Sequence, residues 1–176
     1  MREEVIMAGF GGQGIMFMGT VLAQAAMEEN KKVTFFPSYG AEMRGGIANC
    51  TVIISDEEIG SPVVTNPGTV IALNQQSTNK FSQRLKKGGL LIIDSSLVGE
   101  EPAGNQIKKV KIAATRIADE LGDKRAANMV ALGAYLKEVK ILKLESLVKS
   151  LAHLLGEKKK GLLDINVKAL ESGYKQ

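Results

Sequence analysis

The chain opens with EEVIMAGFGGQGI at residues 3–15, an apolar run that breaks into a cluster of glycines. The run has the length and composition of a buried strand, and the glycines at 9–14 favour a tight turn. From 14 to 29, apolar side chains recur at helical spacing, with small residues that permit close approach to a sheet. KKVTFF at 31–36 then favours a second strand, closed by Pro37. This order of strand, glycine turn, helix and strand predicts a βαβ unit.

Further strands and helices follow from the same periodicities. Strands are expected at 47–54, 69–74, 88–94 and 106–114, and helices at 76–87, 115–121, 125–138, 143–155 and 162–173. Asp123 is placed to cap the helix at 125–138, and Gly156 is placed to end the helix at 143–155. In 106–114, Ile107 and Val110 are out of phase, which indicates a bulge or an edge strand. The sum, over residues 1–176, is a single three-layer α/β/α domain with a mostly parallel, Rossmann-like sheet and a helical C-terminal third.

The composition excludes several classes of site. The 176 residues are 44% hydrophobic and 24% charged, with Cys50 as the single cysteine and His153 as the single histidine. An iron–sulfur cluster needs about four cysteine ligands, and a structural zinc ion needs more than one Cys and one His. A disulfide framework is excluded too, so the expected compartment is a reducing cytoplasm. Cys50 is expected to be a small buried hydrophobe, and His153 to be structural.

The charge pattern does not favour nucleic acid or membrane as a partner. Lys and Arg number 23 against 19 Asp and Glu, a net charge of +4, and most later lysines stand singly on expected helix surfaces. No aromatic residues interleave with them, so a solvated face is the better interpretation. No apolar run approaches the ~20 residues of a spanning helix, and the N-terminus does not have the pattern of a secretory signal.

The glycine cluster fits the pattern GxGxxG between a strand and a helix, where backbone N–H groups can receive a phosphate. Three alternatives stay open: a packed turn without ligand, a contact with coenzyme A or a nucleotide, and an NAD site. The NAD site lacks the acidic residue expected at the end of the second strand, because Glu42 lies beyond it in a loop. No GK[ST] follows, which excludes a P-loop. The candidate phosphate or coenzyme A contacts are Gly9, Gly11, Gly12, Gln13 and Gly14.

A second candidate region is PSYGAEMRGG at 37–46, which lies at the carboxyl end of the second expected strand. In an open α/β sheet, ligands and partners bind at this end of the strands. One alternative is a Glu42–Arg44 pair that steadies a long connection. The other is a surface for a partner subunit or its substrate, since a guanidinium can clamp a carboxylate or phosphate. The residues assigned to this interface or substrate channel are Ser38, Tyr39, Glu42, Met43, Arg44, Gly45, Gly46 and, from the helix at 125–138, Asn128.

Isolated polar residues are weaker candidates. Asn128 interrupts an apolar helical face, so it is either a buried amide satisfied by a backbone carbonyl or a polar contact at an interface. Asn66 and Asn74 follow strand ends and fit turn and helix-cap chemistry. No nucleophile–base pair or carboxylate cluster stands out, so we assign no catalytic and no metal-binding residue to this chain.

Several motifs taken together resemble the gamma subunit of 2-oxoacid:ferredoxin oxidoreductases. They occur in order over nearly the whole chain: GFGGQGI (9–15), PSYGAEMRGGIANC (37–50), VIISDEEIGSPVV (52–64), ALNQQS (72–77), NMVALG (128–133) and LLDINVKALESGYK (162–175).

The resemblance implies an enzyme complex that oxidatively decarboxylates a 2-oxoacid, forms the acyl-coenzyme A and passes two electrons to ferredoxin. Thiamine diphosphate and magnesium would then lie between alpha and beta subunits, and iron–sulfur clusters in a beta or delta subunit. This chain would hold no cofactor, would be inactive alone, and would meet ferredoxin only indirectly. The isolated chain could pair as a homodimer through its uncovered partner surface.

Two loops indicate which substrate type of this family the chain resembles most. Phe10 stands where the pyruvate type tends to have Arg, and SYGAEMRGG resembles the 2-oxoglutarate type, with Ala41 in place of the usual Pro. The resemblance therefore favours 2-oxoglutarate, with the 2-oxoisovalerate or pyruvate type as alternatives. Two rivals from other classes remain: a stand-alone nucleotide-binding oxidoreductase, and a structural or regulatory module without ligand.

Overall fold

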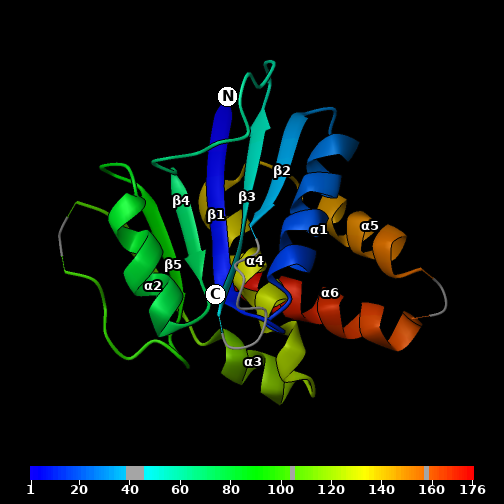
Figure 1. The fold of residues 1–176 in the computed structure, drawn as a ribbon. Helices are drawn as coiled ribbons and strands as arrows, with labels where there is room; N and C mark the ends of the chain where they lie inside the picture. Colours follow the sequence, from blue (N-terminus) through cyan, green and yellow to red (C-terminus); the bar gives the residue numbers. More distant parts are fainter. Residues whose placement is uncertain (39–45, 104–105, 157–158) are drawn as a thin grey trace.

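The computed structural model describes residues 1–38, 46–103, 106–156 and 159–176, and within these ranges the strands form one six-stranded sheet with helices on both faces (Figure 1). The strands are β1 (Arg2–Phe10), β2 (Lys32–Ser38), β3 (Ile47–Ser55), β4 (Thr69–Ala72), β5 (Leu90–Asp94) and β6 (Lys108–Ile112). Their spatial order is β2-β3-β1-β4-β5-β6. The α/β architecture with a mostly parallel sheet is confirmed.

One strand departs from the simple βαβ unit. β1, β4, β5 and β6 run parallel, whereas β3 lies between β1 and β2 and is antiparallel to both. The reason is the length of the connection: residues 39–46 are too few for a crossover, which takes a dozen or more residues, but suffice for an antiparallel return. β2 therefore runs in the direction of β1 without pairing with it.

The helices are α1 (Ile15–Glu28), α2 (Gln75–Phe81), α3 (Ala114–Glu120), α4 (Ala127–Val139), α5 (Leu144–Leu155) and α6 (Lys160–Lys175), with short 3-10 turns η1 (Ser82–Arg84) and η2 (Lys124–Ala126). Alternate residues of β1 face two separate cores. Val5 and Met7 join the larger core under α1 and α4, and Ile6 and Ala8 join the smaller one with Phe81 of α2. α5 packs on α1, and α6 on α4, so this face of the sheet is covered more deeply than the other (Figure 1).

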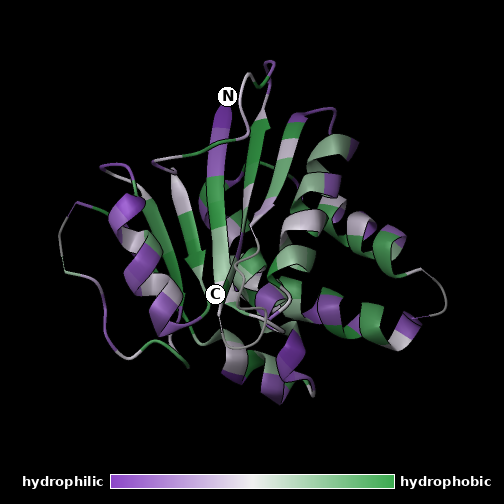
Figure 2. Ribbon diagram, in the orientation of Figure 1, coloured by the Kyte–Doolittle hydropathy of each residue, from purple (hydrophilic) through white to green (hydrophobic). Residues whose placement is uncertain are grey.

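Helix α4 is the most buried helix of the fold. Every residue from Ala127 to Leu136 is buried, as its almost entirely apolar sequence requires. Gly133 and Gly173 let α4 and α6 approach closely: a Cβ on Gly173 would lie 1.9 Å from the Val130 carbonyl oxygen. Hydrophobic residues accordingly concentrate in the strands and in the helix faces turned towards them (Figure 2).

The ends of several elements differ from the expected ones for identifiable reasons. β2 continues through Pro37 to Ser38, because an edge strand tolerates a residue without an N–H. β1 continues to Phe10, which pairs with Ile47 of β3. The edge position predicted for 106–114 is confirmed by β6. Asp123 caps η2, immediately before α4, and Gly156 ends α5 with a positive φ of 65°.

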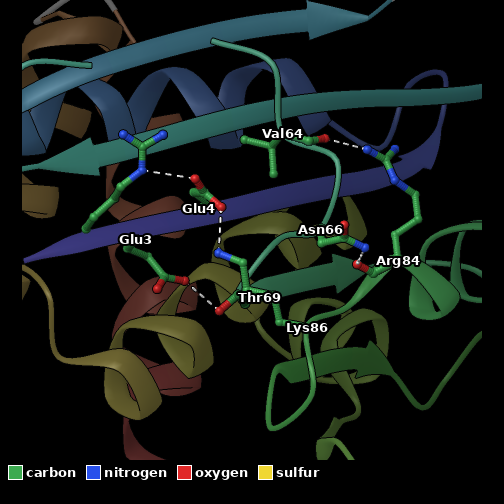
Figure 3. Close-up of polar contacts among 8 residues, drawn as sticks. Glu3, Glu4, Val64, Asn66, Thr69, Arg84 and Lys86 are labelled. Carbon is green, nitrogen blue, oxygen red and sulfur yellow. Dashed lines mark hydrogen bonds and ion pairs between the residues drawn. The ribbon is translucent and has the colours of Figure 1, made fainter. Parts of the chain in front are cut away.

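A polar network ties the connection between β3 and β4 to the start of the sheet (Figure 3). Arg84 donates to the carbonyl oxygens of Val64 (2.5 Å) and Thr65 (3.1 Å). Glu4 accepts from Arg2 and Lys86, and Glu3 accepts from the Thr69 hydroxyl. The network lies at the amino ends of β1 and β4, at the end of the sheet opposite the candidate site.

No helix in the described part of the chain is long and apolar enough to cross a membrane.

Candidate functional site

Both glycine-rich segments join the sheet at the same end, where its parallel strands finish. The turn after β1 lies where the parallel strands β1, β4, β5 and β6 end. Ser38 pairs with Asn49, and Phe10 with Ile47, so β2 finishes and β3 begins at this end too. Gly46, next to Ile47, therefore lies close to the turn, whereas Ser38 lies one strand further away, level with Ala8. The remaining predicted loop residues lie outside the described residues: Tyr39, Glu42, Met43, Arg44 and Gly45.

Gln13 closes the glycine turn from inside. Its backbone N–H donates to the Phe10 carbonyl oxygen (3.1 Å), and its side-chain Oε1 accepts from the Phe10 N–H (2.6 Å). Its Nε2 donates to the carbonyl oxygen of Leu73, after β4 (3.2 Å). The Gln13 side chain is thus hydrogen-bonded within the protein, whereas the sequence predicts that it contacts a ligand.

The glycines of the turn fall into two groups. A Cβ on Gly9 would lie 2.6 Å from Gln13 Oε1, and one on Gly14, where φ is +70°, would lie 2.4 Å from Asn128 Nδ2. Gly12 has φ +98° and nothing within 4 Å of a built Cβ. Gly11 and Gly12 are exposed, and among the described residues no acceptor bonds their N–H groups. Packing thus explains Gly9 and Gly14, whereas the backbone of Gly11 and Gly12 is open to a ligand.

Two asparagines hold the turn from neighbouring elements. Asn128 of α4 is 2% exposed and donates from Nδ2 to the Gly14 carbonyl oxygen (3.0 Å), so it is the buried amide of the first alternative. Asn74 caps α2 through Oδ1, which accepts from the Ser77 N–H (2.8 Å), as expected for a cap. Asn74 also donates from Nδ2 to Gln13 Oε1 (3.2 Å). Sequence reasoning missed this second contact.

Two hollows flank the turn and share Gly12 and Arg125. The larger has a volume of about 430 Å³ and passes between Phe17, Leu155 and Leu162, with Lys159 on its lining. The smaller has a volume of about 230 Å³ and includes Lys124. Both hollows therefore have basic side chains on their lining, but Asp123 also lines the larger hollow and Lys124 pairs with Asp119 (3.4 Å). Lys159 adds positive charge to the larger hollow, which favours an anionic group.

Arg125 is itself held in place by Asp123. Its Nη2 lies 2.7 Å from Asp123 Oδ2, and its Nε also donates to this carboxylate. Hydrogen bonds from Arg125 lower the pKa of Asp123, so the carboxylate is ionised at neutral pH. The pair fixes the guanidinium at the rim of both hollows.

Cys50 and His153, which the sequence predicts to be structural, line neither of the two hollows. Cys50 is buried in β3, its thiol donates to the Ile15 carbonyl oxygen (3.5 Å), and burial raises its pKa to about 12. His153 is exposed on α5. Across residues 1–38, 46–103, 106–156 and 159–176, no group of three or more His, Cys, Asp or Glu side chains could hold a metal ion.

Comparison with known proteins gives consistent matches over almost the whole chain. The family described as pyruvate ferredoxin/flavodoxin oxidoreductase matches residues 4–176. The ketoisovalerate oxidoreductase subunit VorA of Methanothermobacter thermautotrophicus is 38% identical over 97% of this chain. That match takes in 35% of the relative, so the chain spans about a third of its length.

Other relatives match from end to end. The 2-oxoglutarate synthase subunit KorC of Methanocaldococcus jannaschii is 37% identical over 99% of this chain and 93% of its own. The crystal structure of the gamma subunit of a keto/oxoacid ferredoxin oxidoreductase from Geobacter sulfurreducens superposes with a TM-score of 0.86 and 31% identity, over 98% of this chain and 96% of that one.

Proposed function

Because the chain belongs to the pyruvate ferredoxin/flavodoxin oxidoreductase family, we propose that it works as the gamma subunit of a multi-subunit 2-oxoacid:ferredoxin oxidoreductase. The observation that carries the proposal is the end-to-end match to a 2-oxoglutarate synthase subunit at 37% identity. The superposition on a gamma subunit over 98% of the chain supports it.

The proposed reaction joins 2-oxoglutarate and coenzyme A to give succinyl-coenzyme A and CO2, with two electrons passed to oxidised ferredoxin. The end-to-end relative and the SYGAEMRGG loop favour this substrate. A branched-chain 2-oxoacid is the second candidate, because a ketoisovalerate oxidoreductase subunit is equally similar over 97% of the chain.

The cofactors of this reaction belong, in our proposal, to alpha, beta and delta partner subunits in the cytoplasm. Thiamine diphosphate supplies the carbanion chemistry there, and iron–sulfur clusters carry the electrons. The donor set of this chain does not fit such a cluster, because its one thiol is buried with a pKa near 12. We therefore assign binding and orientation, rather than catalysis, to the residues of this chain.

The edge that carries both glycine segments is the proposed surface towards the partner subunits and coenzyme A. Three features support it: the exposed backbone of Gly11 and Gly12, the neighbouring start of α1, and Arg125 and Lys159 on the larger hollow. A helix start with free N–H groups favours a phosphate, and coenzyme A carries several. Ser38 and Gly46 belong to the same proposed surface.

The substrate assignment is tested by co-expressing this chain with its partner subunits and purifying the complex. The measurement is kcat/KM for 2-oxoglutarate, 2-oxoisovalerate and pyruvate, each with coenzyme A and a ferredoxin. We expect 2-oxoglutarate to give the highest value. A preference for 2-oxoisovalerate would transfer the assignment to the branched-chain type.

The contact with coenzyme A is tested by Arg44→Ala in the same complex. Removing a guanidinium that clamps a phosphate should raise KM for coenzyme A about tenfold or more, since a hydrogen bond to a charged group contributes about 1.5–3 kcal/mol. The control is Arg2→Ala, at the opposite edge of the sheet. If neither KM nor subunit co-purification changes in Arg44→Ala, the loop is a structural connection.

A stand-alone nucleotide-binding oxidoreductase is the rival from another class. It requires the isolated chain to bind NAD or FAD, so titration with each cofactor decides between the two. We expect no binding, because β2 ends in Phe36-Pro37-Ser38 without the carboxylate that would hold the ribose.

A further inference from the structure

We propose that Asn74 is a positioning residue for the glycine turn: acting through Gln13, and together with Asn128, it fixes the direction of the Gly11 and Gly12 backbone towards the co-substrate. The inference rests on the proposed function, and it assigns Asn74 a role beyond that of a helix cap.

Asn74 joins two elements with the two ends of one amide. Its Oδ1 accepts from the Ser77 N–H and begins α2, and its Nδ2 donates to Gln13 Oε1. Asn74 is 1% exposed, and its bond with Ser77 is buried, whereas its bond with the half-buried Gln13 is part-buried. The amide of asparagine provides an acceptor and a donor on two separate atoms. Among the other good cap residues, an ionised Asp has only acceptors, and Ser has a single Oγ on a shorter side chain to serve both partners.

Gln13 passes this constraint into the turn. The same Oε1 that accepts from Asn74 also accepts from the Phe10 N–H, and Nε2 reaches the Leu73 carbonyl oxygen. The donor from Asn74 therefore adds a third contact that favours the same orientation of the Gln13 amide, with Oε1 towards Phe10. Without it, the Gln13 amide is held by two hydrogen bonds instead of three, and the bond from the Phe10 N–H weakens.

Asn128 fixes the other end of the turn. Its Nδ2 donates to the Gly14 carbonyl oxygen, and its Oδ1 accepts from the Met129 N–H (2.9 Å). Three motifs that are far apart in sequence, GFGGQG, NQQS and NMVALG, thus form one hydrogen-bonded unit. The unit holds Gly9 and Gly14 from inside and leaves the backbone between them exposed.

The test uses two variants that keep the cap: Asn74→Asp removes the donor, and Asn74→Ser replaces it with a hydroxyl on a shorter side chain. Both residues cap helices well, so α2 should still form. The matched controls are Asn79→Asp and Asn79→Ser, on the exposed side of the same helix. The full complex is assayed for KM of coenzyme A and for kcat, and the full chain for hydrogen exchange of the Phe10 and Gln13 amides.

We expect the Asn74 variants to assemble with their partners and to keep kcat within about twofold, while KM for coenzyme A rises about three- to tenfold, as loss of one neutral hydrogen bond implies. The Phe10 amide should exchange faster, and the Asn79 variants should match the wild type in both measurements. Asn74 variants that assemble with unchanged KM, or that fold but do not assemble, contradict the proposal. A wild-type complex without 2-oxoacid activity would instead contradict the proposed function.

Discussion

At the scale of single residues, the contact between Gly14 and Asn128 explains why a glycine is needed at the start of α1. Gly14 has a left-handed backbone, and its Cα faces the Asn128 amide with no room for a Cβ. Gly12 shares the positive φ but faces open space. The two glycines therefore separate the effect of the backbone from the effect of packing.

We predict that Gly14→Ala destabilises the chain by about 2–4 kcal/mol, against about 1–2 kcal/mol for the control Gly12→Ala, because only the first adds a clash to the left-handed strain. The free energy of unfolding is measured by urea titration. The double variant Gly14→Ala, Asn128→Ala should lose less than the sum of its single variants. Equal losses for the two glycines would refute the role of Asn128.

Glu3 and Glu4 are neighbouring carboxylates whose pKa values shift in opposite directions (Figure 3). Burial raises the pKa of Glu3, although the hydrogen bond from Thr69 Oγ1 (2.6 Å) opposes it. Burial also acts to raise the pKa of Glu4, but hydrogen bonds from Lys86 and Arg2 outweigh it and lower the value. Glu3 therefore favours the folded state in acid and loses that contribution as pH rises through its raised pKa. Glu4 contributes at neutral pH and loses its contribution as pH falls.

We predict that Glu3→Gln raises the melting temperature at pH 7 and that Glu4→Gln lowers it. Glutamine at position 3 still accepts from Thr69 without a charge to desolvate, whereas glutamine at position 4 loses two charged hydrogen bonds. Both differences from the wild type should shrink below about pH 4, where carboxylates protonate. Melting curves between pH 3 and 8 check this. Shifts of the same sign at pH 7 would rule out the opposite roles.

At the scale of elements, helix periods and turn residues sufficed to locate the helices, but pairing between strands did not follow from them. α1 and α5 begin within one residue of their expected starts because their apolar spacing is regular. The place of β3 between β1 and β2 depends on the short 39–46 connection rather than on its own residues. Likewise, the sequence predicts that Pro37 closes β2, whereas the strand continues to Ser38. An edge strand tolerates proline, and the edge position is a property of the whole sheet.

The contact between α4 and α6 provides a test at this scale. Gly173→Ala should destabilise the chain by at least about 2 kcal/mol, because its Cβ would strike the Val130 carbonyl oxygen and force the helices apart. Gly161→Ala is the control in the same helix: nothing lies within 4 Å of its Cβ, so it should be neutral or stabilise by up to about 1 kcal/mol. Thermal unfolding of both variants decides; a neutral Gly173→Ala would disprove the close packing.

At the scale of the whole molecule, the sequence motifs were sufficient for the family and insufficient for the site. The glycine cluster is evident in the sequence, but the sequence does not show that the Gln13 side chain turns inward or that Asn74 hydrogen-bonds to it. Those contacts join Gln13 to residues 60 and 61 positions further along the chain, and they depend on β1 and β4 being neighbours in the sheet. The burial of Cys50 does follow from the sequence, because an apolar residue within a central strand is buried whatever its neighbours are.

We propose above all that this chain is a necessary, non-catalytic subunit of a 2-oxoacid:ferredoxin oxidoreductase. The most direct measurement is coenzyme A-dependent reduction of ferredoxin by 2-oxoglutarate, with partner subunits purified without this chain and then supplemented with it. We predict background activity without the chain, recovery on its addition in proportion to the assembled complex, and no activity of the chain alone. Full turnover by the partner subunits without the chain would contradict the account.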